Sequence, residues 1–298
     1  MSILSQNKFL YTTLLTVVLC SIGFAFLHFN LMGYGYTFFI LVPLCAGYFL
    51  GTKPTLKTST LLSLAVGLVA FLFLLVTAEL ELFYCVILLL PLAFALMVLG
   101  MFIGWEIRKL VESKKNKNIS LTIYPLLILL FSTVIEHYFS EKYDIAKVES
   151  KIYLPYPKEM VFDFIKSVDT VNTSKPLLLK LGLAIPEKCV LQNEVIGAKR
   201  VCYFDAGSIE EKVTAIKRGE ILKMDVTQCN LPGNKWLKFL EATYLFENKD
   251  GGTILTRITT YKTELKPRFY WSFWEKKSIQ AEHEYVLNDL KQRLQNKK

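Results

Sequence analysis

The sequence is poor in the residues and motifs that most enzymes use for chemistry. It has three histidines, His28, His137 and His283, and none of them lies in an HExxH pair or at another metal-ligand spacing. A GxSxG nucleophile elbow, a phosphate-binding glycine loop and a GxGxxG fingerprint are also missing. We therefore expect no metal ion and no cofactor, and no motif indicates an enzyme.

Cysteine is also scarce, with six residues in the chain. The C-terminal half holds three of them, Cys189, Cys202 and Cys229, and none is part of a CxxC pair. Because three is an odd number, at least one has no partner within that half, and a disulfide framework is not expected. The sequence predicts structural burial for all three thiols.

Charge is missing from long stretches of the N-terminal half. Hydrophobic residues make up 52% of the chain, which is too apolar for one ordinary soluble domain. Uncharged runs of about 20 residues predict five transmembrane helices, at 9–29, 34–51, 61–78, 82–105 and 118–138. The first run is too long and lacks the small-x-small site of a cleaved signal. The fifth contains Pro125 and ends at Glu136, so an interfacial or re-entrant segment is the alternative.

The basic residues of the loops predict an orientation. One set of alternate loops carries eight, and the opposite loops, 30–33 and 79–81, carry none. The positive-inside rule then places the N-terminus in the cytoplasm of a bacterial cell, and a spanning fifth helix would place the rest outside the inner membrane. No charged residue lies in the middle of a run, which argues against a pump or channel. The eight are Lys8, Lys53, Lys57, Arg108, Lys109, Lys114, Lys115 and Lys117.

The composition changes at about residue 140, which divides the chain into a helical transmembrane domain at 1–140 and a second domain at 141–298. Period-two alternation and turn residues in the second domain predict an α+β fold, in which an antiparallel sheet is covered by one long helix. Its predicted strands are 146–154, 189–195, 199–204, 209–216, 221–228, 236–247 and 253–264, with helices at 158–168, at 175–183 and from 267 onward.

The segment SKIYLPYPKEMVFDFIKSVD gives this order of elements a likeness to a known fold. A strand ends at Pro155, and Glu159 and the pair Val161-Phe162 follow on the first helix. With Gly197 and Gly219 before later strands, the chain resembles the START-like helix-grip superfamily, also called SRPBCC or polyketide cyclase/dehydrase-like, fused to a multi-pass membrane anchor as in some bacterial proteins. The resemblance implies a sheet wrapped around the C-terminal helix and a hydrophobic ligand, such as a lipid, an isoprenoid or a polyketide-like molecule.

Alternation also predicts which side chains face the covered side of the sheet. The more apolar set of each strand is taken as inward, which places Arg257 and Thr259 on the opposite face. These side chains line a ligand cavity or form a filled core, and the sequence leaves both open. The predicted set is Met224, Trp236, Leu240, Tyr244, Thr256, Ile258 and Thr260 from the strands, and Phe269, Phe273, Trp274 and His283 from the helix. Trp271 is expected to face outward beside Lys276 and Lys277, as at a membrane interface.

Two polar residues are weak catalytic candidates. Glu211 shares the parity of Ile209 and Val213, so burial could suit it to proton transfer, whereas exposure near the strand end is the alternative. His283 lies on the apolar stripe of the terminal helix, where a satisfied core histidine is the alternative.

The composition leaves three functions open. The net charge of +9 is spread over loops and the terminal helix, so nucleic-acid binding is not indicated. The leading hypothesis is a membrane-anchored START-like domain that binds or transfers an apolar small molecule or membrane lipid at the membrane surface. The rivals are a sensory or scaffolding protein with a filled domain and a cyclase- or dehydrase-type enzyme. Protein partners are not identified by the sequence, although the scaffolding alternative would bind one.

Overall fold

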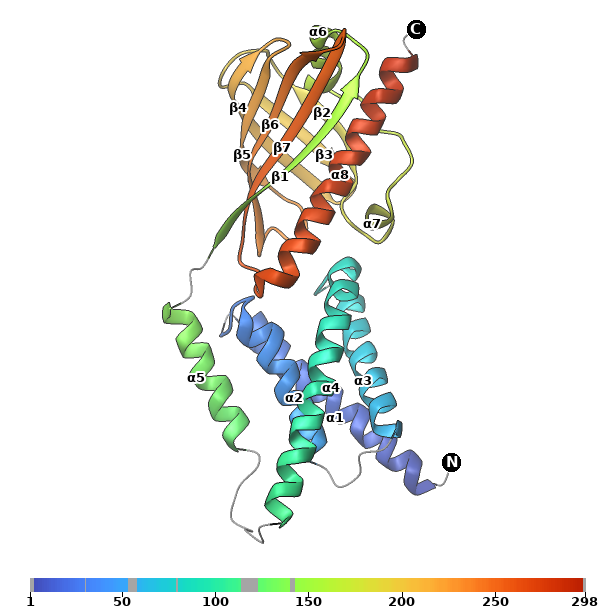
Figure 1. Cartoon of the computed structure of the whole chain (residues 1–298), viewed down its shortest axis with the longest axis vertical. Coiled ribbons are helices and arrows are strands. Elements are labelled where there is room, and N and C mark those ends of the chain that lie inside the picture. Colours follow the sequence, from blue (N-terminus) through green and yellow to red (C-terminus); the bar gives the residue numbers. More distant parts are fainter. Residues whose placement is uncertain are drawn as a thin grey trace. The chain divides into compact units, whose positions relative to one another are not determined.

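A computed structural model describes residues 3–29, 31–52, 58–78, 80–113, 123–139 and 143–296 (Figure 1). The chain divides into two compact units, one of Met1–Glu141 with Lys266–Arg268 and one of Lys142–Leu265 with Phe269–Lys298. The predicted domain boundary and several of the loop lysines that predicted the orientation lie outside the described residues. Those lysines are Lys53, Lys57, Lys114, Lys115 and Lys117.

The described part of the N-terminal unit is helical (Figure 1). Three of its helices are long and apolar enough to cross a membrane, at Phe9–His28, Thr60–Thr77 and Phe83–Glu112, whereas Thr37–Gly51 and Tyr124–Glu136 are shorter. Three of the five predicted runs therefore have the length and apolarity that a membrane span needs, and that they cross a membrane stays a prediction. A turn before residue 36 shortens the second, and the first residues of the fifth, 118–122, lie outside the described part of the chain. The helices are α1 (Ile3–His28), η1 (Thr37–Leu41), α2 (Val42–Gly51), α3 (Thr58–Thr77), α4 (Phe83–Ser113) and α5 (Ile123–Phe139).

Two glycine motifs let helices α2 and α4 touch backbone to backbone. A Cβ atom on Gly47 would lie 1.9 Å from the carbonyl oxygen of Met97, and one on Gly100 would lie 2.1 Å from that of Leu44. No side chain larger than hydrogen fits at such a distance, so this packing requires glycine. The same close approach recurs one turn along each helix, at Gly51 and Gly104.

The carboxylate of Glu136 in α5 binds the beginning of the η1–α2 segment. Its Oε1 accepts a hydrogen bond from the backbone N–H of Tyr36 at 2.6 Å, and its Oε2 accepts one from Thr37 at 3.0 Å. A negative charge at a helix N-terminus is stabilised by the unpaired N–H groups there. Glu136, at the polar end of the fifth apolar run, therefore connects α5 to the start of the η1–α2 segment.

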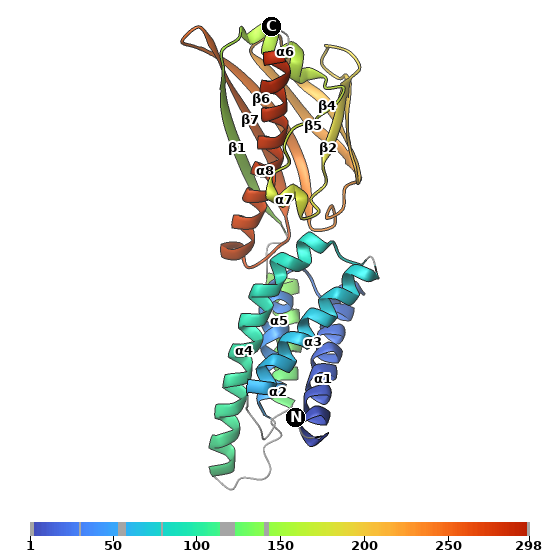
Figure 2. The same cartoon turned by 90° about the vertical axis from the view of Figure 1, so that its right-hand side faces the viewer.

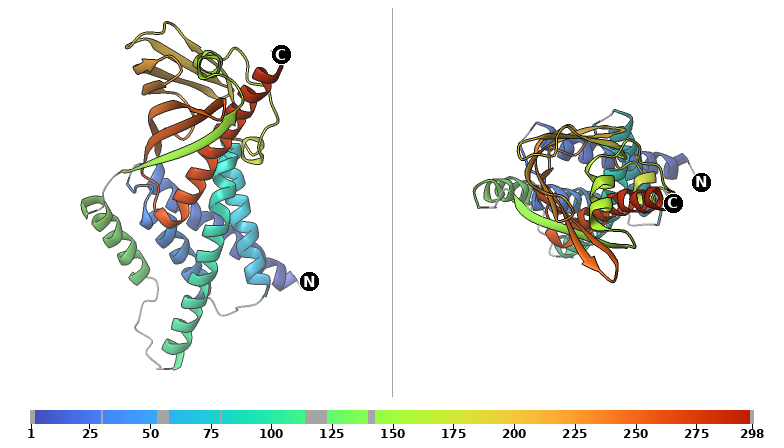
Figure 3. Two further views of the ribbon diagram at one scale, coloured as in Figure 1. Left: turned by 45° about the horizontal axis from the view of Figure 1, so that its top comes forward. Right: turned by 90° about the horizontal axis from the view of Figure 1, so that it is seen from above.

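The C-terminal unit is a curved antiparallel sheet whose concave side is covered by helix α8 (Arg268–Asn296) (Figures 2 and 3). The strand order is β1-β7-β6-β5-β4-β3-β2, so the first strand pairs with the last. This architecture confirms the predicted helix-grip fold. The strands are β1 (Asp144–Leu154), β2 (Pro186–Leu191), β3 (Lys199–Phe204), β4 (Gly207–Lys217), β5 (Ile221–Cys229), β6 (Leu237–Lys249) and β7 (Gly252–Thr263), and the short helices are α6 (Lys158–Lys166) and α7 (Leu177–Lys180).

A two-residue turn sets the register of the long β6–β7 hairpin. Lys249 pairs with Gly252, and the two residues between them, Asp250 and Gly251, have positive φ angles of 48° and 77°. Aspartate and glycine tolerate this left-handed conformation, which matches the twist of the flanking strands. The predicted turn at 249–252 is confirmed.

Cys189 and Cys202 form a disulfide, so the prediction that all three thiols of this half are only buried is wrong for these two. They are separated by 13 residues in sequence but are direct partners in the pairing of β2 with β3. Neighbouring strands bring such a pair together, and the sequence spacing carries no sign of it. Cys229 is a free, partly buried thiol.

Candidate functional site

The face of β7 that points at helix α8 is not the one that alternation predicted. Thr259 Oγ1 lies 2.8 Å from His283 Nε2, and Tyr261 donates a hydrogen bond to Glu275 at 3.1 Å. The odd-numbered residues therefore face the helix, since successive side chains of a strand point to opposite faces. The predicted inward position of Thr256, Ile258 and Thr260 is wrong.

The physical reason is that the inward face of β7 is partly polar. Ile254 and Ile258 made the even-numbered set look more apolar. The odd-numbered set holds Arg257 and hydroxyl residues whose partners are supplied by α8, such as Thr263, which donates to Glu275 at 2.8 Å. Partners that are distant in sequence thus make this polar set suitable for burial.

A β-bulge interrupts the predicted alternation of β6. Phe239 pairs with Tyr261 but Glu241 pairs with Thr260, so Leu240 is an extra residue without a cross-strand partner. Trp236 precedes the strand, and the expectation that it and Leu240 share the face of Tyr244 is wrong. Beyond the bulge the prediction holds, because Tyr244 is buried in the core. On β5, Met224 is fully buried in that core as well.

The first turns of α8 are rotated relative to the prediction. Phe269 and Phe273 are 77% and 53% exposed, whereas Trp271 is buried and Trp274 is partly buried. The buried stripe runs from Trp271 through Glu275 and Ile279, at the spacing of helical turns. Glu275 is a buried glutamate that accepts hydrogen bonds from Tyr261 and Thr263 of β7. A prediction based on apolarity alone therefore placed the wrong face of α8 against the sheet. That any predicted residue lines a ligand cavity stays a prediction.

His283 lies completely buried between the sheet and α8. Its Nε2 pairs with Thr259 Oγ1 at 2.8 Å and its Nδ1 pairs with Ser150 Oγ of β1 at 2.9 Å. Burial, with the nearby positive charge of Arg257, lowers the pKa of His283 to about 2. The imidazole is therefore neutral and has both nitrogens paired, which is the satisfied core histidine of the two alternatives.

Glu211 is buried too, and its partner is Arg200 of β3. Arg200 Nη1 donates to Glu211 Oε2 at 2.7 Å, and both side chains are almost inaccessible to solvent. Arg200 also donates from Nε to the carbonyl of Lys166 at 3.0 Å and from Nη2 to that of Ile165 at 3.4 Å. These carbonyls end helix α6, where a positive charge is favourable. Glu211 thus takes part in a structural ion pair that fixes α6 on the sheet.

Arg257, a residue that sequence reasoning placed on the wrong face, is the least satisfied group of the interior. Its side chain is 11% exposed, and its Nη2 contacts Glu282 of α8, at 3.0 Å from Oε1 and 2.9 Å from Oε2. Its Cζ lies 5.5 Å from the ring centre of Tyr244. Its Nε and Nη1 are buried and have no hydrogen-bond partner among the described residues. Unpaired buried donors are costly, so these two N–H groups lower the stability of the interior.

The two ends of the concave face differ in packing. At the end near α6, the core is filled by large side chains, including Phe162, Leu222 and Leu290. Further along, Val226 and Phe239 remain partly exposed although both belong to the inward set. Val226 is the partner of buried Glu211, and Phe239 is the partner of buried Tyr261. The concave face is thus less completely filled at the level of Val226 and Phe239 than at the α6 end.

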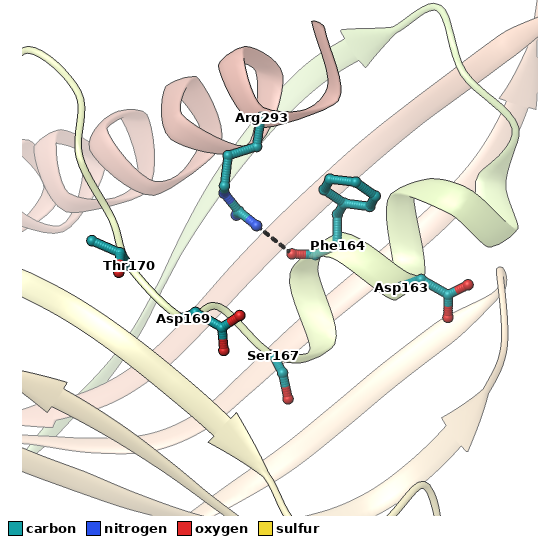
Figure 4. A pocket seen from close by; sticks show the side chains of 6 residues that line it. All are labelled: Asp163, Phe164, Ser167, Asp169, Thr170 and Arg293. Atoms are coloured by element: carbon teal, nitrogen blue, oxygen red, sulfur yellow. Dashed lines mark hydrogen bonds between the residues drawn. The ribbon is translucent and has the colours of Figure 1, made fainter. Parts of the chain in front are cut away.

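A separate pocket lies at the surface where helix α6 ends (Figure 4). Its volume is about 360 Å³, and Arg293 of α8 forms one wall by donating to the carbonyl of Phe164 at 3.1 Å. The other lining residues are Asp163, Ser167, Asp169 and Thr170. None of the predicted site residues lies in it, and no group of three or more possible metal ligands occurs in the described ranges.

Comparison with known proteins assigns no function. No family model matches the chain, and no curated protein matches it. Among solved structures, protein MLL2253 from Mesorhizobium loti is 14% identical over 51% of this chain and 99% of its own, with a TM-score of 0.36. Major latex-like protein 151 from Panax ginseng is 14% identical over 50% and 97%, with a TM-score of 0.34. The Aha1 dimer from Colwellia psychrerythraea is 12% identical over 48% and 92%, with a TM-score of 0.32.

Proposed function

We propose that this chain is a membrane-anchored helix-grip protein that binds an apolar molecule on the concave face of its sheet, beside α8. The observation that carries the proposal is the less completely filled part of that face. A domain that used its core only for stability would fill this region as it fills the α6 end. Val226 and Phe239 are instead partly open, and the cross-strand partner of Val226 is the buried Glu211. Apolar walls with a few polar groups are typical of small-molecule sites.

The exposed aromatic residues at the start of α8 support a position at the membrane surface. Asp144, the first residue of β1, pairs with Thr263, the last residue of β7, so α8 begins at the end of the sheet that the N-terminal unit is joined to. Phe269 and Phe273 are exposed at this end, and the exposed Lys276 and Lys277 follow one turn later. Aromatic rings and lysines together suit the headgroup region of an anionic bilayer.

We further propose that the helix-grip unit lies outside the cytoplasm, on the outer side of a bacterial inner membrane. Five crossings, the count that agrees with the alternation of basic and uncharged loops, place the C-terminal unit on the side opposite the N-terminus. The Cys189–Cys202 disulfide supports this side, because disulfides persist in oxidising compartments. Alkaline phosphatase fused after Lys298 should be active in cells, and activity only of a cytoplasmic reporter would contradict the topology.

The ligand proposal is tested on the full chain purified in mild detergent. Extraction and mass spectrometry should find an apolar molecule in fixed ratio to the protein. Val226→Trp should reduce that ratio severalfold because the indole fills this part of the face. The matched control is Val195→Trp, since Val195 is 57% exposed in a surface loop. An absence of any bound molecule, together with no saturable binding of an added apolar fluorophore, would overturn the proposal.

The membrane contact has its own test. A benzophenone amino acid in place of Phe273 should cross-link to lipid in intact membranes, and one in place of Lys291, near the other end of α8, should not. Equal lipid labelling at both positions, or none at position 273, would refute a membrane-facing start of α8.

A further inference from the structure

Helix α7 is the centre of an apolar and basic segment on the surface of the helix-grip unit. Residues 170–186 hold two lysines, Lys175 and Lys180, and no acidic residue. Both lysines are exposed, and Leu177 between them is 69% exposed. A single exposed leucine is ordinary on a protein surface, whereas a group of leucines bordered by lysines marks an interaction site. The other leucines of the segment that are partly exposed are Leu178, Leu181 and Leu183.

The domain holds this segment in a fixed position. Leu179 is buried in a cluster with Val171 and Tyr285 of α8. The hydroxyl of Tyr285 donates to the carbonyl of Val171 at 3.2 Å, and the backbone N–H of Asn172 donates to Asp289 Oδ1 of α8 at 2.9 Å. The outward leucines therefore lie on an anchored segment, which loses little conformational freedom when it binds.

The segment lies at the same end of the sheet as the start of α8 (Figure 2). Neighbouring strands of this sheet are antiparallel, so β1, β2, β4 and β6 all start at the end where β7 finishes. Helix α7 leads into the start of β2, and α8 follows the end of β7. Val226 and Phe239, where the concave face is less completely filled, are close to this end of β5 and β6. The exposed leucines, the exposed rings of α8 and the less filled part of the face thus share one end of the unit.

The opposite end of the sheet has exposed apolar side chains with a different charge environment. Val195 and Ile196, in the loop between β2 and β3, are 57% and 71% exposed. Glu194 precedes them, and residues 189–198 contain no lysine or arginine. The two ends are therefore alike in apolar exposure and differ in charge. Only the α7 end combines apolar side chains with the cations that an anionic lipid surface attracts.

We propose that the α7 segment docks on the headgroup layer of an anionic bilayer, as a second contact beside the start of α8. Leu177 enters the interface, and Lys175 and Lys180 pair with anionic headgroups. Phe139 of α5 and Asp144 of β1 are five residues apart, which span at most about 18 Å, so a membrane-embedded α5 keeps this end of the sheet within reach of the bilayer. The inference rests on the proposed function, because it requires that the helix-grip unit is anchored at a membrane.

The test uses the full chain with a fluorescent amino acid, sensitive to its environment, in place of Leu177. The protein is reconstituted into vesicles of phosphatidylglycerol and phosphatidylcholine in equal amounts, and bromine atoms on the acyl chains quench a probe that enters the bilayer. The matched control carries the same probe in place of Ile196, at the other end of the sheet. Both side chains are exposed, so the probe is tolerated, and the urea midpoint of each labelled chain checks its fold.

The probe at position 177 should be quenched, and the probe at position 196 should keep its emission. Replacing Lys175 and Lys180 by glutamine should lower the ratio of docked to undocked segment, read from the quenched fraction, about fivefold for each lysine. Replacing phosphatidylglycerol by phosphatidylcholine should have a similar effect.

Four results would overturn this docking surface. They are no quenching at position 177, equal quenching at both positions, quenching that does not depend on phosphatidylglycerol, and a blue shift at position 177 without quenching, which would show that protein covers α7. Lipid cross-linking at position 273 and a co-purified apolar molecule would then leave the proposed function standing. The absence of those two signals as well would refute the proposed function itself.

Discussion

Replacing Arg200 by methionine should be among the most damaging single changes in the helix-grip unit. The residue is 2% exposed, and its side chain makes three hydrogen bonds, to Glu211 and to the carbonyls of Ile165 and Lys166. Its removal leaves Glu211 buried with an uncompensated charge, which costs about 3–5 kcal/mol. The two carbonyls that lose a charged donor add about 1 kcal/mol. We therefore expect the free energy of unfolding to fall by about 4–6 kcal/mol.

Urea unfolding of the full chain in mild detergent measures this loss. Intrinsic fluorescence reports mainly on the helix-grip unit, since it contains Trp236, Trp271 and Trp274 out of four tryptophans in the chain. With an m-value of about 2 kcal/mol/M, the midpoint should fall by about 2–3 M. Adding Glu211→Gln to the variant removes the uncompensated charge and should restore about 2–3 kcal/mol of that stability.

Two outcomes would refute this reasoning. The first is a midpoint shift below about 0.5 M for the arginine variant, because a buried charge would then have found another partner. The second is additive losses in the double variant, because coupled residues must deviate from additivity. Lys217→Met is the control, since Lys217 and its partner Glu220 form an exposed ion pair that contributes little to stability.

Three further perturbations test other parts of the structure. Because the pKa of His283 falls from 6.5 to about 2 on folding, only the unfolded state binds this proton between those two pH values. The free energy of unfolding should therefore decrease as the pH is lowered below about 6.5, by up to about 1.4 kcal/mol per pH unit. In His283→Asn, the urea midpoint should depend less on pH over this range. Cys202→Ser removes the disulfide between two residues 13 apart and should lower the free energy of unfolding by about 3 kcal/mol in the same urea assay. The control Cys229→Ser changes a free thiol and should leave the urea midpoint unchanged. Gly100→Ala should make the N-terminal unit sensitive to protease in detergent because its Cβ would meet the backbone of α2, whereas Gly33→Ala, which has no atom within 4 Å of the new Cβ, should stay resistant.

The sequence alone predicts the features that depend on local pattern. Long uncharged runs indicate helices of membrane length, and three of them have that length in the structure. Period-two alternation and the Asp250-Gly251 turn predict the antiparallel strands and the longest hairpin. Away from bulges and buried charges, alternation also places side chains correctly, as for Met224. These signals are local because each depends on residues within one element.

Tertiary structure decided the features that depend on a partner from another element. Arg257 faces inward because Glu282, 25 residues later, neutralises it, and no pattern in β7 shows this. The extra residue Leu240 changes the parity of β6, and the pairing of β2 with β3 joins Cys189 to Cys202. Apolarity is a property of a single residue, whereas the suitability of a polar group for burial is a property of a pair. The fold could therefore be predicted from the sequence, but the buried polar groups of the concave face could not.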